Sequence, residues 1–139
     1  MNLVAVFVEN KPGQTARITS ILAEAKINIR WVTIANNGSF GVMKFLVDRC
    51  EEALSCFRAH GIMVSLLEVI AVEVENQPGA LQHIAECLGR SNLNLDNCSG
   101  FVANDRAILL VETDRLSEAC GVLSAAGMKL LTQEQMLNL

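Results

Sequence analysis

The sequence lacks the residues that mark several common classes of protein. It contains no tyrosine, a single tryptophan and two histidines, and aromatic residues make up 4% of its 139 positions. A sheet that binds single-stranded RNA needs exposed aromatics for base stacking and a basic surface around them. The net charge is −4 instead, which disfavours both nucleic acid and anionic membranes. We therefore expect neither nucleic acid nor a membrane as a partner.

Long apolar runs and export signals are also missing. No apolar run reaches the roughly 18 residues that a membrane span requires. The N-terminal segment has neither the basic start nor the cleavage site of a secretion signal. Five cysteines occur without a CxxC pair, so we expect reduced thiols in the core of a cytoplasmic protein. Packing is favoured over metal binding because no ligand spacing recurs.

Signatures of catalysis are absent as well. The sequence contains no Ser/His/Asp set, no phosphate-binding Walker loop and no dinucleotide fingerprint. His60 precedes a glycine at the end of an expected helix, where it can contact the last carbonyls. His83 lies on the outer side of another expected helix, and neither histidine has a partner that would make it a general base. We predict a protein that is not an enzyme and that needs neither a cofactor nor a metal.

What the sequence does contain is an internal repeat. Its only two prolines, Pro12 and Pro78, are 66 residues apart, and shifting the chain by 66 aligns its halves without a gap. The segment VENKPGQ in the first half matches VENQPGA in the second, and the Asp-Arg pairs at 48–49 and 114–115 also match. We interpret these pairs as helix N-cap signals. A gapless repeat of this length indicates two copies of one small domain.

Hydrophobic periodicity predicts the same order of elements in both copies. In the first copy, apolar residues at helical spacing predict helices that begin near Gln14 and near Ala53. The pair Asn37-Gly38 predicts a hairpin turn. The four expected strands cover residues 3–9, 27–35, 40–48 and 62–66. The order is βαββαβ, and the second copy repeats it from about residue 68 to residue 132.

The βαββαβ order predicts an α+β fold with two ferredoxin-like units. Each unit should have a four-stranded antiparallel sheet with both helices on one face. We place the units at residues 1–66 and 67–139. The connecting segment 62–76 contains no glycine, no proline and no charge run. We therefore expect no flexible linker and a fixed relative pose of the two units.

Each copy opens with a strand that ends in Glu-Asn-x-Pro-Gly before a helix. In the first copy, the N–H groups of Gly13, Gln14 and Thr15 lack an intrahelical acceptor at the positive end of the helix dipole, where a carboxylate is favoured. Gly13 lets a ligand approach the backbone closely, and Asn10 offers both a donor and an acceptor. The loop can supply the groups that bind a free amino acid. Ordinary turn chemistry explains the same residues, so both interpretations stay open at this point.

The pattern resembles the ACT domain, the amino-acid-binding regulatory module of biosynthetic enzymes. The resemblance covers nearly the whole chain. It depends on two βαββαβ units, each opening with ENxPG before a helix–strand run of the form xxxIxxxLxxxxxN[IL]. It implies a tandem ACT protein that holds an amino acid where two ACT units meet and that regulates a metabolic enzyme or regulator.

In this family, the loop asparagine and an asparagine at the start of the second strand are recurrent ligand contacts. Carried over by motif, the candidate ligand-binding residues are Asn10, Pro12, Gly13, Gln14, Thr15, Asn28 and Ile29 in the first copy, and Asn76, Pro78, Gly79, Ala80, Leu81, Asn94 and Leu95 in the second. Serine-binding members carry a histidine two residues before the loop asparagine, where this chain has Val8 and Val74. The resemblance therefore implies a small apolar amino acid as the ligand. Because the copies differ at several of these positions, the two sites should be unequal.

Two alternatives to a free-standing sensor are kept. One is a regulatory subunit that acts in trans, since the small subunit of acetolactate synthase has a similar LEN entry to its loop. The other is a structural or interaction module without a ligand.

The first strand also predicts self-association. Leu3, Ala5 and Phe7 alternate with three valines, so both faces of this strand are apolar and are expected to be buried. Helices cover one face of the sheet, which leaves the other in need of cover. We expect a homodimer in which the sheets of two chains pack together.

Overall fold

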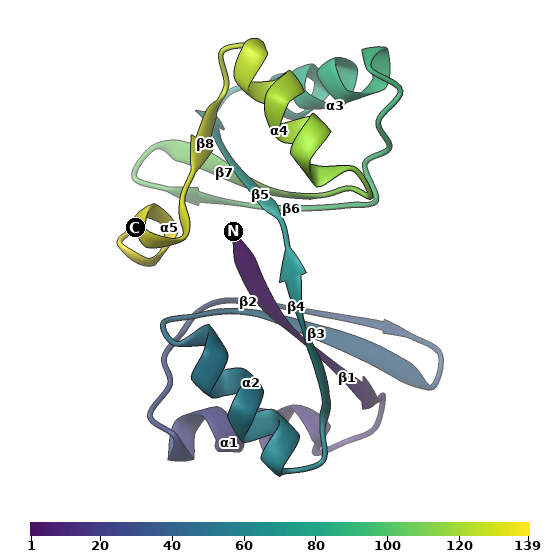
Figure 1. Cartoon of the computed structure of the whole chain (residues 1–139), viewed down its shortest axis with the longest axis vertical. Coiled ribbons are helices and arrows are strands. Elements are labelled where there is room, and N and C mark those ends of the chain that lie inside the picture. Colours follow the sequence, from purple (N-terminus) through teal and green to yellow (C-terminus); the bar gives the residue numbers. More distant parts are fainter. The chain divides into compact units, whose positions relative to one another are not determined.

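The computed structural model describes all 139 residues, and the chain separates into two compact units (Figure 1). The N-terminal unit comprises residues 2–67, and the C-terminal unit comprises residues 68–139 together with Met1. Each unit has one four-stranded antiparallel sheet with a pair of helices on one of its faces. The predicted α+β fold of two ferredoxin-like units is confirmed.

The N-terminal unit follows the predicted βαββαβ order. Its elements are β1 (Asn2–Glu9), α1 (Gln14–Glu24), β2 (Ile29–Asn37), β3 (Phe40–Val47), α2 (Cys50–Ala59) and β4 (Met63–Glu68). The sheet order is β2-β3-β1-β4. The two most apolar strands, β1 and β3, therefore lie in the centre of the sheet, where both neighbours satisfy their backbone groups.

The C-terminal unit repeats this arrangement. Its elements are β5 (Ile70–Glu75), α3 (Ala80–Arg90), β6 (Asn97–Ala103), β7 (Arg106–Glu112), α4 (Leu116–Ala125) and β8 (Lys129–Leu131), and its sheet order is β6-β7-β5-β8. None of the helices in the chain combines the length and the apolar character needed to cross a membrane.

A short helix that the sequence interpretation did not include, α5 (Gln133–Leu137), follows β8. Its start is a capping box. The Thr132 hydroxyl accepts a hydrogen bond from the Gln135 N–H (3.2 Å), and the Gln135 side chain accepts one from the Thr132 N–H (2.9 Å). The signal was therefore present in the sequence as Thr-x-x-Gln.

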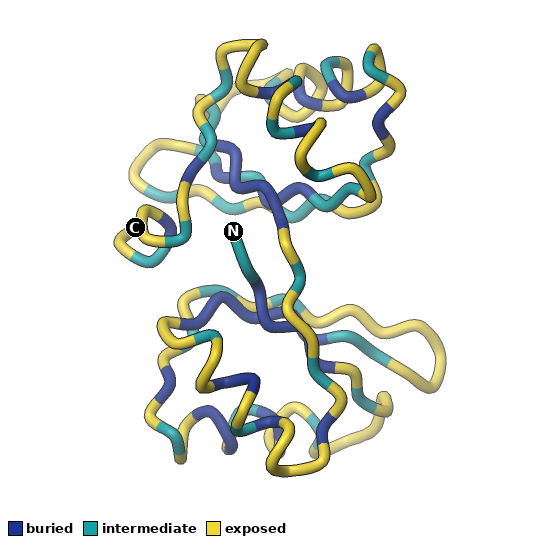
Figure 2. Tube along the Cα trace, viewed as in Figure 1, coloured by how far each residue is buried: buried dark blue, intermediate teal, exposed yellow.

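The core of each unit lies between its sheet and its helices, where buried residues gather on the facing sides (Figure 2). In the N-terminal unit, Ile18 of α1 and Phe57 of α2 are fully buried with Phe45 of β3. The rings of Phe45 and Phe57 stack with centroids 6.5 Å apart. The equivalent positions of the C-terminal unit hold the smaller residues Val111 and Leu123, which are also fully buried.

Several boundaries differ from the sequence prediction; α2, for example, begins at Cys50 rather than near Ala53, and β4 ends at Glu68 rather than at residue 66. Two of the differences have a clear structural reason. Strand β2 begins at Ile29 rather than at residue 27, because the buried Ile27 lies in the turn that closes α1, where its N–H donates to the Leu22 carbonyl (2.9 Å). The hairpin turn consists of residues 38–39 rather than 37–38, since Asn37 still pairs with Phe40 in the ladder.

Candidate ligand-binding site

The Glu-Asn-x-Pro-Gly turn has the same geometry in both units. Gly13 (φ 89°, ψ −14°) and Gly79 (φ 95°, ψ −8°) are the N-cap residues of α1 and α3, and both are in the left-handed region. A side chain would be strained in this conformation. Neither helix start has a side-chain cap. The sequence therefore begins each helix with exposed backbone.

The first turn of each helix leaves amide groups unsatisfied. The Arg17 N–H donates to the Gly13 carbonyl (3.0 Å), and the His83 N–H donates to the Gly79 carbonyl (2.9 Å). The first N–H group of each helix, that of Gln14 or Ala80, donates to the carbonyl of Lys11 (3.3 Å) or Gln77 (3.4 Å) in the turn. The next two N–H groups have no acceptor within their helix, and the helix dipole makes this end positive. A carboxylate placed there gains hydrogen bonds and a favourable charge interaction.

In the C-terminal unit, a cavity of about 500 Å³ lies at this end of α3. Its lining comes from β5, the Pro-Gly turn, the first turn of α3, the start of β7, and the loop between α4 and β8 together with the first residue of β8. The lining residues are Glu73, Val74, Glu75, Gln77, Pro78, Gly79, Ala80, His83, Arg106, Ala126, Gly127, Met128 and Lys129. The volume lies within the range of small-molecule sites in proteins.

Three charged side chains form an ion cluster on the wall of this cavity. The Glu73 carboxylate lies 3.1 Å from Arg106 Nη1 and 3.1 Å from Lys129 Nζ. The Glu73 side chain is 11% exposed, whereas both cations are 58% exposed. Strand register explains the cluster, because Glu73 lies opposite Lys129, and Arg106 lies opposite Glu75, the next residue of β5 on the same face.

The charges of the cavity are balanced. The ion cluster carries one net positive charge, and Glu75 adds one negative charge without a side-chain partner of its own. Val74 and Met128 supply apolar lining. The cavity therefore offers a carboxylate to an ammonium group and helix amides to a carboxylate, which are the two charged groups of a zwitterion.

In the corresponding loop of the N-terminal unit, the charged and amide side chains already bond to neighbouring groups of the same unit. Lys11 Nζ lies 2.8 Å from Glu9 Oε2, and the hydrogen bond and charge of Lys11 lower the pKa of the Glu9 carboxyl. The Asn10 amide donates to the Gly38 carbonyl (3.0 Å), and the Asn10 N–H donates to the Ser39 carbonyl (2.7 Å). Asn10 thus ties this loop to the β2–β3 turn, a structural role that the sequence interpretation did not include.

The asparagines near the start of β2 and β6 lie away from the Pro-Gly turns. Asn28 and Ile29 line a second hollow, of about 480 Å³, beside α1. The Asn94 amide donates to Asp96 (2.6 Å). In each unit an 11-residue helix separates the two predicted asparagines, and such a helix is about 16 Å long. A small ligand held within one unit contacts the turn or the second asparagine, but not both.

The structure therefore brings together only part of the predicted set. Pro78, Gly79 and Ala80 line the cavity at α3. Asn76 and Leu81 are exposed residues of the same turn and helix start that are not part of the lining, and Leu95 packs against the core. The residues at the equivalent turn of α1 are Asn10, Pro12, Gly13, Gln14 and Thr15.

The charged lining residues were not among the predicted positions. The sequence does indicate these residues, but through positions at which the two copies differ rather than through positions at which they are identical. At an offset of 66 residues, Glu73, Arg106 and Lys129 stand where the first copy has Phe7, Phe40 and Met63. An interpretation that compares only identical positions overlooks these three substitutions.

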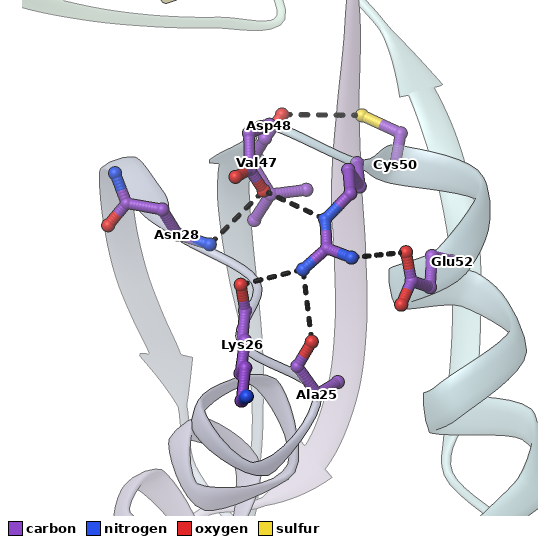
Figure 3. A network of polar contacts seen from close by, with 8 residues as sticks. Ala25, Lys26, Asn28, Val47, Asp48, Cys50 and Glu52 are labelled. Atoms are coloured by element: carbon purple, nitrogen blue, oxygen red, sulfur yellow. Dashed lines mark hydrogen bonds and ion pairs between the residues drawn. The ribbon is translucent and has the colours of Figure 1, made fainter.

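The Asp-Arg pair before α2 does not act as the predicted N-cap (Figure 3). Arg49 is the N-cap residue, but its side chain does not cap the free N–H groups of α2. Its guanidinium donates instead to the carbonyls of Ala25 (3.0 Å) and Lys26 (2.6 Å) at the end of α1, and pairs with Glu52 (2.7 Å). The cation therefore caps the negative end of the preceding helix.

The second copy repeats this device. Arg115 donates to the Asn92 carbonyl at the end of α3 and lies 3.2 Å from Glu118. Both pairs do mark the start of a helix, since Arg49 and Arg115 are the N-cap residues of α2 and α4, but neither side chain caps that helix. The long arginine side chain reaches instead a helix end that is distant in sequence but adjacent in the fold.

The cysteines and the acidic residues form no metal-binding arrangement. All five cysteines are partly buried and none forms a disulfide, and burial raises the pKa of the Cys50 and Cys98 thiols. No group of three or more His, Cys, Asp or Glu side chains is placed to hold a metal ion.

Several solved structures share the fold of this chain. A protein from Bacteroides thetaiotaomicron is 24% identical with a TM-score of 0.92, and the match covers 99% of this chain and 96% of that one. The regulatory subunits of aspartate kinase from Thermus thermophilus, in its ligand-free form, and from Thermus flavus are 18% and 14% identical. Both have a TM-score of 0.61, and each match covers 90% of this chain and 91% of the other. Among curated proteins, none matches this sequence.

The family is established by the sequence as a whole. A family model described as an ACT domain pair matches residues 1–139. This match agrees with the two βαββαβ units and with the Pro-Gly turn that begins the first helix of each. The chain belongs to the ACT domain pair family.

Proposed function

We propose that the protein is a non-catalytic regulator that binds a free amino acid in its C-terminal unit. The observation that carries the proposal is the cavity at the start of α3. Unsatisfied helix amides, the partner-free carboxylate of Glu75 and the ion cluster around Glu73 meet there within a single unit. A charge-balanced cavity with both a donor and an acceptor region suits a zwitterion better than a simple anion or cation.

The proposed complex uses each part of this lining. The ligand carboxylate accepts hydrogen bonds from the N–H groups that follow Ala80 in the first turn of α3, since the Ala80 N–H itself donates to the Gln77 carbonyl. The ammonium group pairs with Glu75. The side chain lies against Val74 and Met128, which favours a small apolar amino acid. Asn76, exposed beside the cavity, is proposed as a peripheral contact.

The N-terminal turn is proposed as a weaker site. It has the same backbone at Gly13, but Lys11 already holds the Glu9 carboxylate, and Asn10 is engaged by the β2–β3 turn. An amino acid would have to displace Lys11 to place its ammonium group, so the two copies should bind with unequal affinity.

Regulation of another protein is the second part of the proposal. Two of the similar structures are regulatory subunits of aspartate kinase. By analogy, we propose a cytoplasmic protein that passes the presence of its amino acid to a metabolic enzyme or regulator. The homodimer expected from the apolar first strand belongs to the same proposal.

A thermal-shift panel of the twenty amino acids at millimolar concentration tests the ligand. A compound that binds only the native state raises the unfolding midpoint. We expect one or a few small apolar amino acids to do so, and calorimetry then gives their affinity. A panel in which no amino acid moves the midpoint would favour an interaction module without a ligand.

A matched pair of variants tests the site. Glu75→Gln and Glu9→Gln neutralise the last residue of the first strand in each copy. Losing a hydrogen bond to a charged group costs about 1.5–3 kcal/mol, so Glu75→Gln should weaken the affinity about tenfold or more. Glu9→Gln should leave it unchanged. Equal effects of the two variants, or no effect of Glu75→Gln, would contradict a site in the C-terminal unit.

A further inference from the structure

The turn of the β2–β3 hairpin (Figure 1) is hydrogen-bonded to the Pro-Gly turn of its own unit. The hairpin turn consists of Gly38 and Ser39, between the paired residues Asn37 and Phe40. The Asn10 N–H donates to the Ser39 carbonyl (2.7 Å), and the Asn10 side-chain amide donates to the Gly38 carbonyl (3.0 Å). We call these two hydrogen bonds the Asn10 clasp. The clasp joins the end of β1 to the tip of a hairpin that lies 28 residues later in the sequence.

The clasp lies at the end of β1, where this strand is no longer buried. Both faces of β1 were predicted to be buried, but Phe7 is 45% exposed and Asn10 is exposed as well. The burial predicted for both faces therefore does not extend to the end of the strand. Beyond Val8, which packs against the core, the hydrogen bonds to the hairpin turn fix the position of the chain.

The C-terminal unit has the same two turns but no such clasp. Asn104 and Asp105 form the turn between β6 and β7, since Ala103 pairs with Arg106. Asn76 is the loop asparagine of this copy, and neither its N–H nor its side-chain amide bonds to that turn. Arg106, directly after the turn, lines the candidate cavity. The hairpin tip of this unit therefore borders the cavity without being bonded to the loop.

The two hairpin turns differ in the direction of one peptide group. In the N-terminal turn only Gly38 has a positive φ (64°), whereas both residues of the C-terminal turn do, Asn104 at 50° and Asp105 at 63°. These patterns are those of a type II′ and a type I′ turn. The two types differ by a rotation of about 180° of the peptide between the central residues. The carbonyl of the first central residue therefore points toward the loop asparagine at Gly38 and to the opposite side of the hairpin at Asn104.

Glycine is required for the clasped form of the turn. The first central residue of a type II′ turn has a backbone conformation that only glycine adopts without strain. An asparagine tolerates the left-handed conformation of a type I′ turn, as at Asn104, but is strained in the other one. The residue at this single position of the hairpin therefore decides whether the loop asparagine is bonded to the turn or free.

We propose that the Asn10 clasp is an autoinhibitory contact that keeps the N-terminal Pro-Gly turn closed to amino acids. The inference rests on the proposed function, and it names a cause, in addition to Lys11, for the unequal affinity of the two copies. The clasp engages the N–H and the side-chain amide of Asn10 and holds the hairpin tip against the turn. In the C-terminal unit, the same asparagine is free and the hairpin tip borders an open cavity. Gly38 acts through Asn10 and is therefore a positioning residue.

Hydrogen exchange tests the clasp without any ligand. The N–H groups of Asn10 and Asn76 both follow Val-Glu in the sequence, but only the first is hydrogen-bonded. In the wild type, the Asn10 N–H should exchange about tenfold more slowly, because exchange requires the clasp to open. Gly38→Asn/Ser39→Asp gives the N-terminal hairpin the turn of the C-terminal one at unchanged length, and the Asn10 N–H should then exchange as fast as that of Asn76. Ser39→Asp alone keeps the glycine and should keep the slow exchange.

An NMR titration with L-alanine, L-valine and L-leucine as probes tests the inhibition. The Thr15 N–H reports on the N-terminal turn and the Leu81 N–H on the C-terminal one, because neither has an acceptor within its helix. Lys11→Gln serves as the reference, so that the carboxylate beside the N-terminal turn is unpaired in every sample. Adding Gly38→Asn/Ser39→Asp should lower the Kd measured at Thr15 about tenfold, which is what two exposed neutral hydrogen bonds are worth. The Kd measured at Leu81 should not change.

Two results would overturn the autoinhibition: equal exchange at Asn10 and Asn76 in the wild type, or a Kd at Thr15 that release of the clasp leaves unchanged while the probes do bind at Leu81. A wild type whose Leu81 N–H responds to none of the probes refutes the proposed site itself, so the two failures are distinguishable. Circular dichroism checks that the variants fold. Should the double variant not fold, Gly38→Asn alone makes the same comparison, because it removes the glycine that the clasp requires.

Discussion

The two units share a fold and a register but differ in what they present on the open face of the sheet. Helix-side positions are conserved between the copies, as at Ile18 and Ile84, which are both fully buried. On the open face, the exposed aromatic Phe40 of one copy is the exposed cation Arg106 of the other. Packing against the helices constrains the first kind of position. The second kind is free to diverge, and the functional differences between the copies are found there.

The two Pro-Gly turns also share a backbone conformation and differ in the side chains around it. Their backbone is nearly identical at Gly13 and Gly79. The residue after the loop asparagine is Lys11 in one copy and Gln77 in the other. That single difference leaves Glu9 paired and Glu75 available to a ligand. With the same backbone, the loop of the N-terminal unit has its carboxylate paired, and the loop of the C-terminal unit forms a candidate site.

The largest expected effect tests whether the two cores are interchangeable. Phe57 is fully buried and stacks on Phe45, so Phe57→Ala should lose about 3–5 kcal/mol of unfolding free energy. Leu123→Ala, at the same position of the C-terminal unit, should lose about 2–5 kcal/mol. Urea unfolding followed by circular dichroism measures both.

The matched variant for this core is Phe57→Leu, which gives the N-terminal unit the residue that the C-terminal unit has. Its loss should be clearly smaller than that of Phe57→Ala, because most of the buried volume is kept. An equal loss would mean that the stacked ring pair is itself required, and that the two cores cannot exchange residues.

The next effect tests a contact that both units share, in which an arginine donates to the carbonyls at the end of the first helix of its unit. Arg49→Met keeps the aliphatic stem of the side chain and removes its hydrogen bonds to the end of α1. The side chain is 42% exposed, so the loss should be only about 1–2 kcal/mol. Arg115→Met should cost about the same, since that side chain is 43% exposed. Arg49→Lys should recover part of the loss, because it keeps the charge without the planar fork. Unequal costs in urea unfolding would show that the shared Asp-Arg motif caps only one of the helices.

The sequence was sufficient to predict the fold because the fold depends on local and periodic signals. Helical spacing at Ile18 and Leu22 recurs 66 residues later, and the repeat itself fixed the number of units. The backbone half of the candidate site was predictable for the same reason, since Pro-Gly before a helix at Gly79 is a local pattern.

The charged half of the site could not be predicted in the same way. Arg106 and Glu73 are 33 residues apart in the sequence, and Lys129 and Glu73 are 56 apart. They meet only because β7 and β8 flank β5 in a particular register. Arg49 was misassigned for a related reason, as its acceptors Ala25 and Lys26 belong to another helix end. Interactions of this kind depend on strand order and register, which composition and periodicity do not specify.

A smaller effect tests the ion cluster of the C-terminal unit, whose positions are Phe7, Phe40 and Met63 in the other copy. Glu73→Gln should lose about 1 kcal/mol at low ionic strength, because both cations are well exposed and their pairing is screened. The loss should shrink as salt is added. Glu75→Gln, on the same strand face but without a partner, should leave the stability unchanged. A salt-independent loss in Glu73→Gln would indicate that packing of the side chain, rather than its charge, stabilises the sheet.

The smallest effect concerns the Pro-Gly loops of the two units. It is measured as the pKa of the Glu9 carboxyl rather than as a change in stability. Lys11→Gln gives the N-terminal loop the residue of the C-terminal one. In the wild type, Lys11 lowers the pKa of Glu9 from its ordinary value of 4.5. A lowered folded-state pKa contributes stability that is present above the ordinary pKa and is lost as the pH falls through the lowered value. Because Glu9 and Lys11 are both solvent-exposed, denaturation should not resolve this contribution.

An NMR titration of the Glu9 carboxyl does resolve it. Its pKa should rise toward 4.5 in Lys11→Gln, and high salt should move the wild-type value in the same direction because salt screens the pair. The variant should also bind the amino acid more readily at its N-terminal turn, since the Glu9 carboxylate is released. If the Glu9 pKa is the same with and without Lys11, the lysine does not hold this carboxylate in solution. The difference between the two loops would then have to come from Asn10 and its bond to the β2–β3 turn alone.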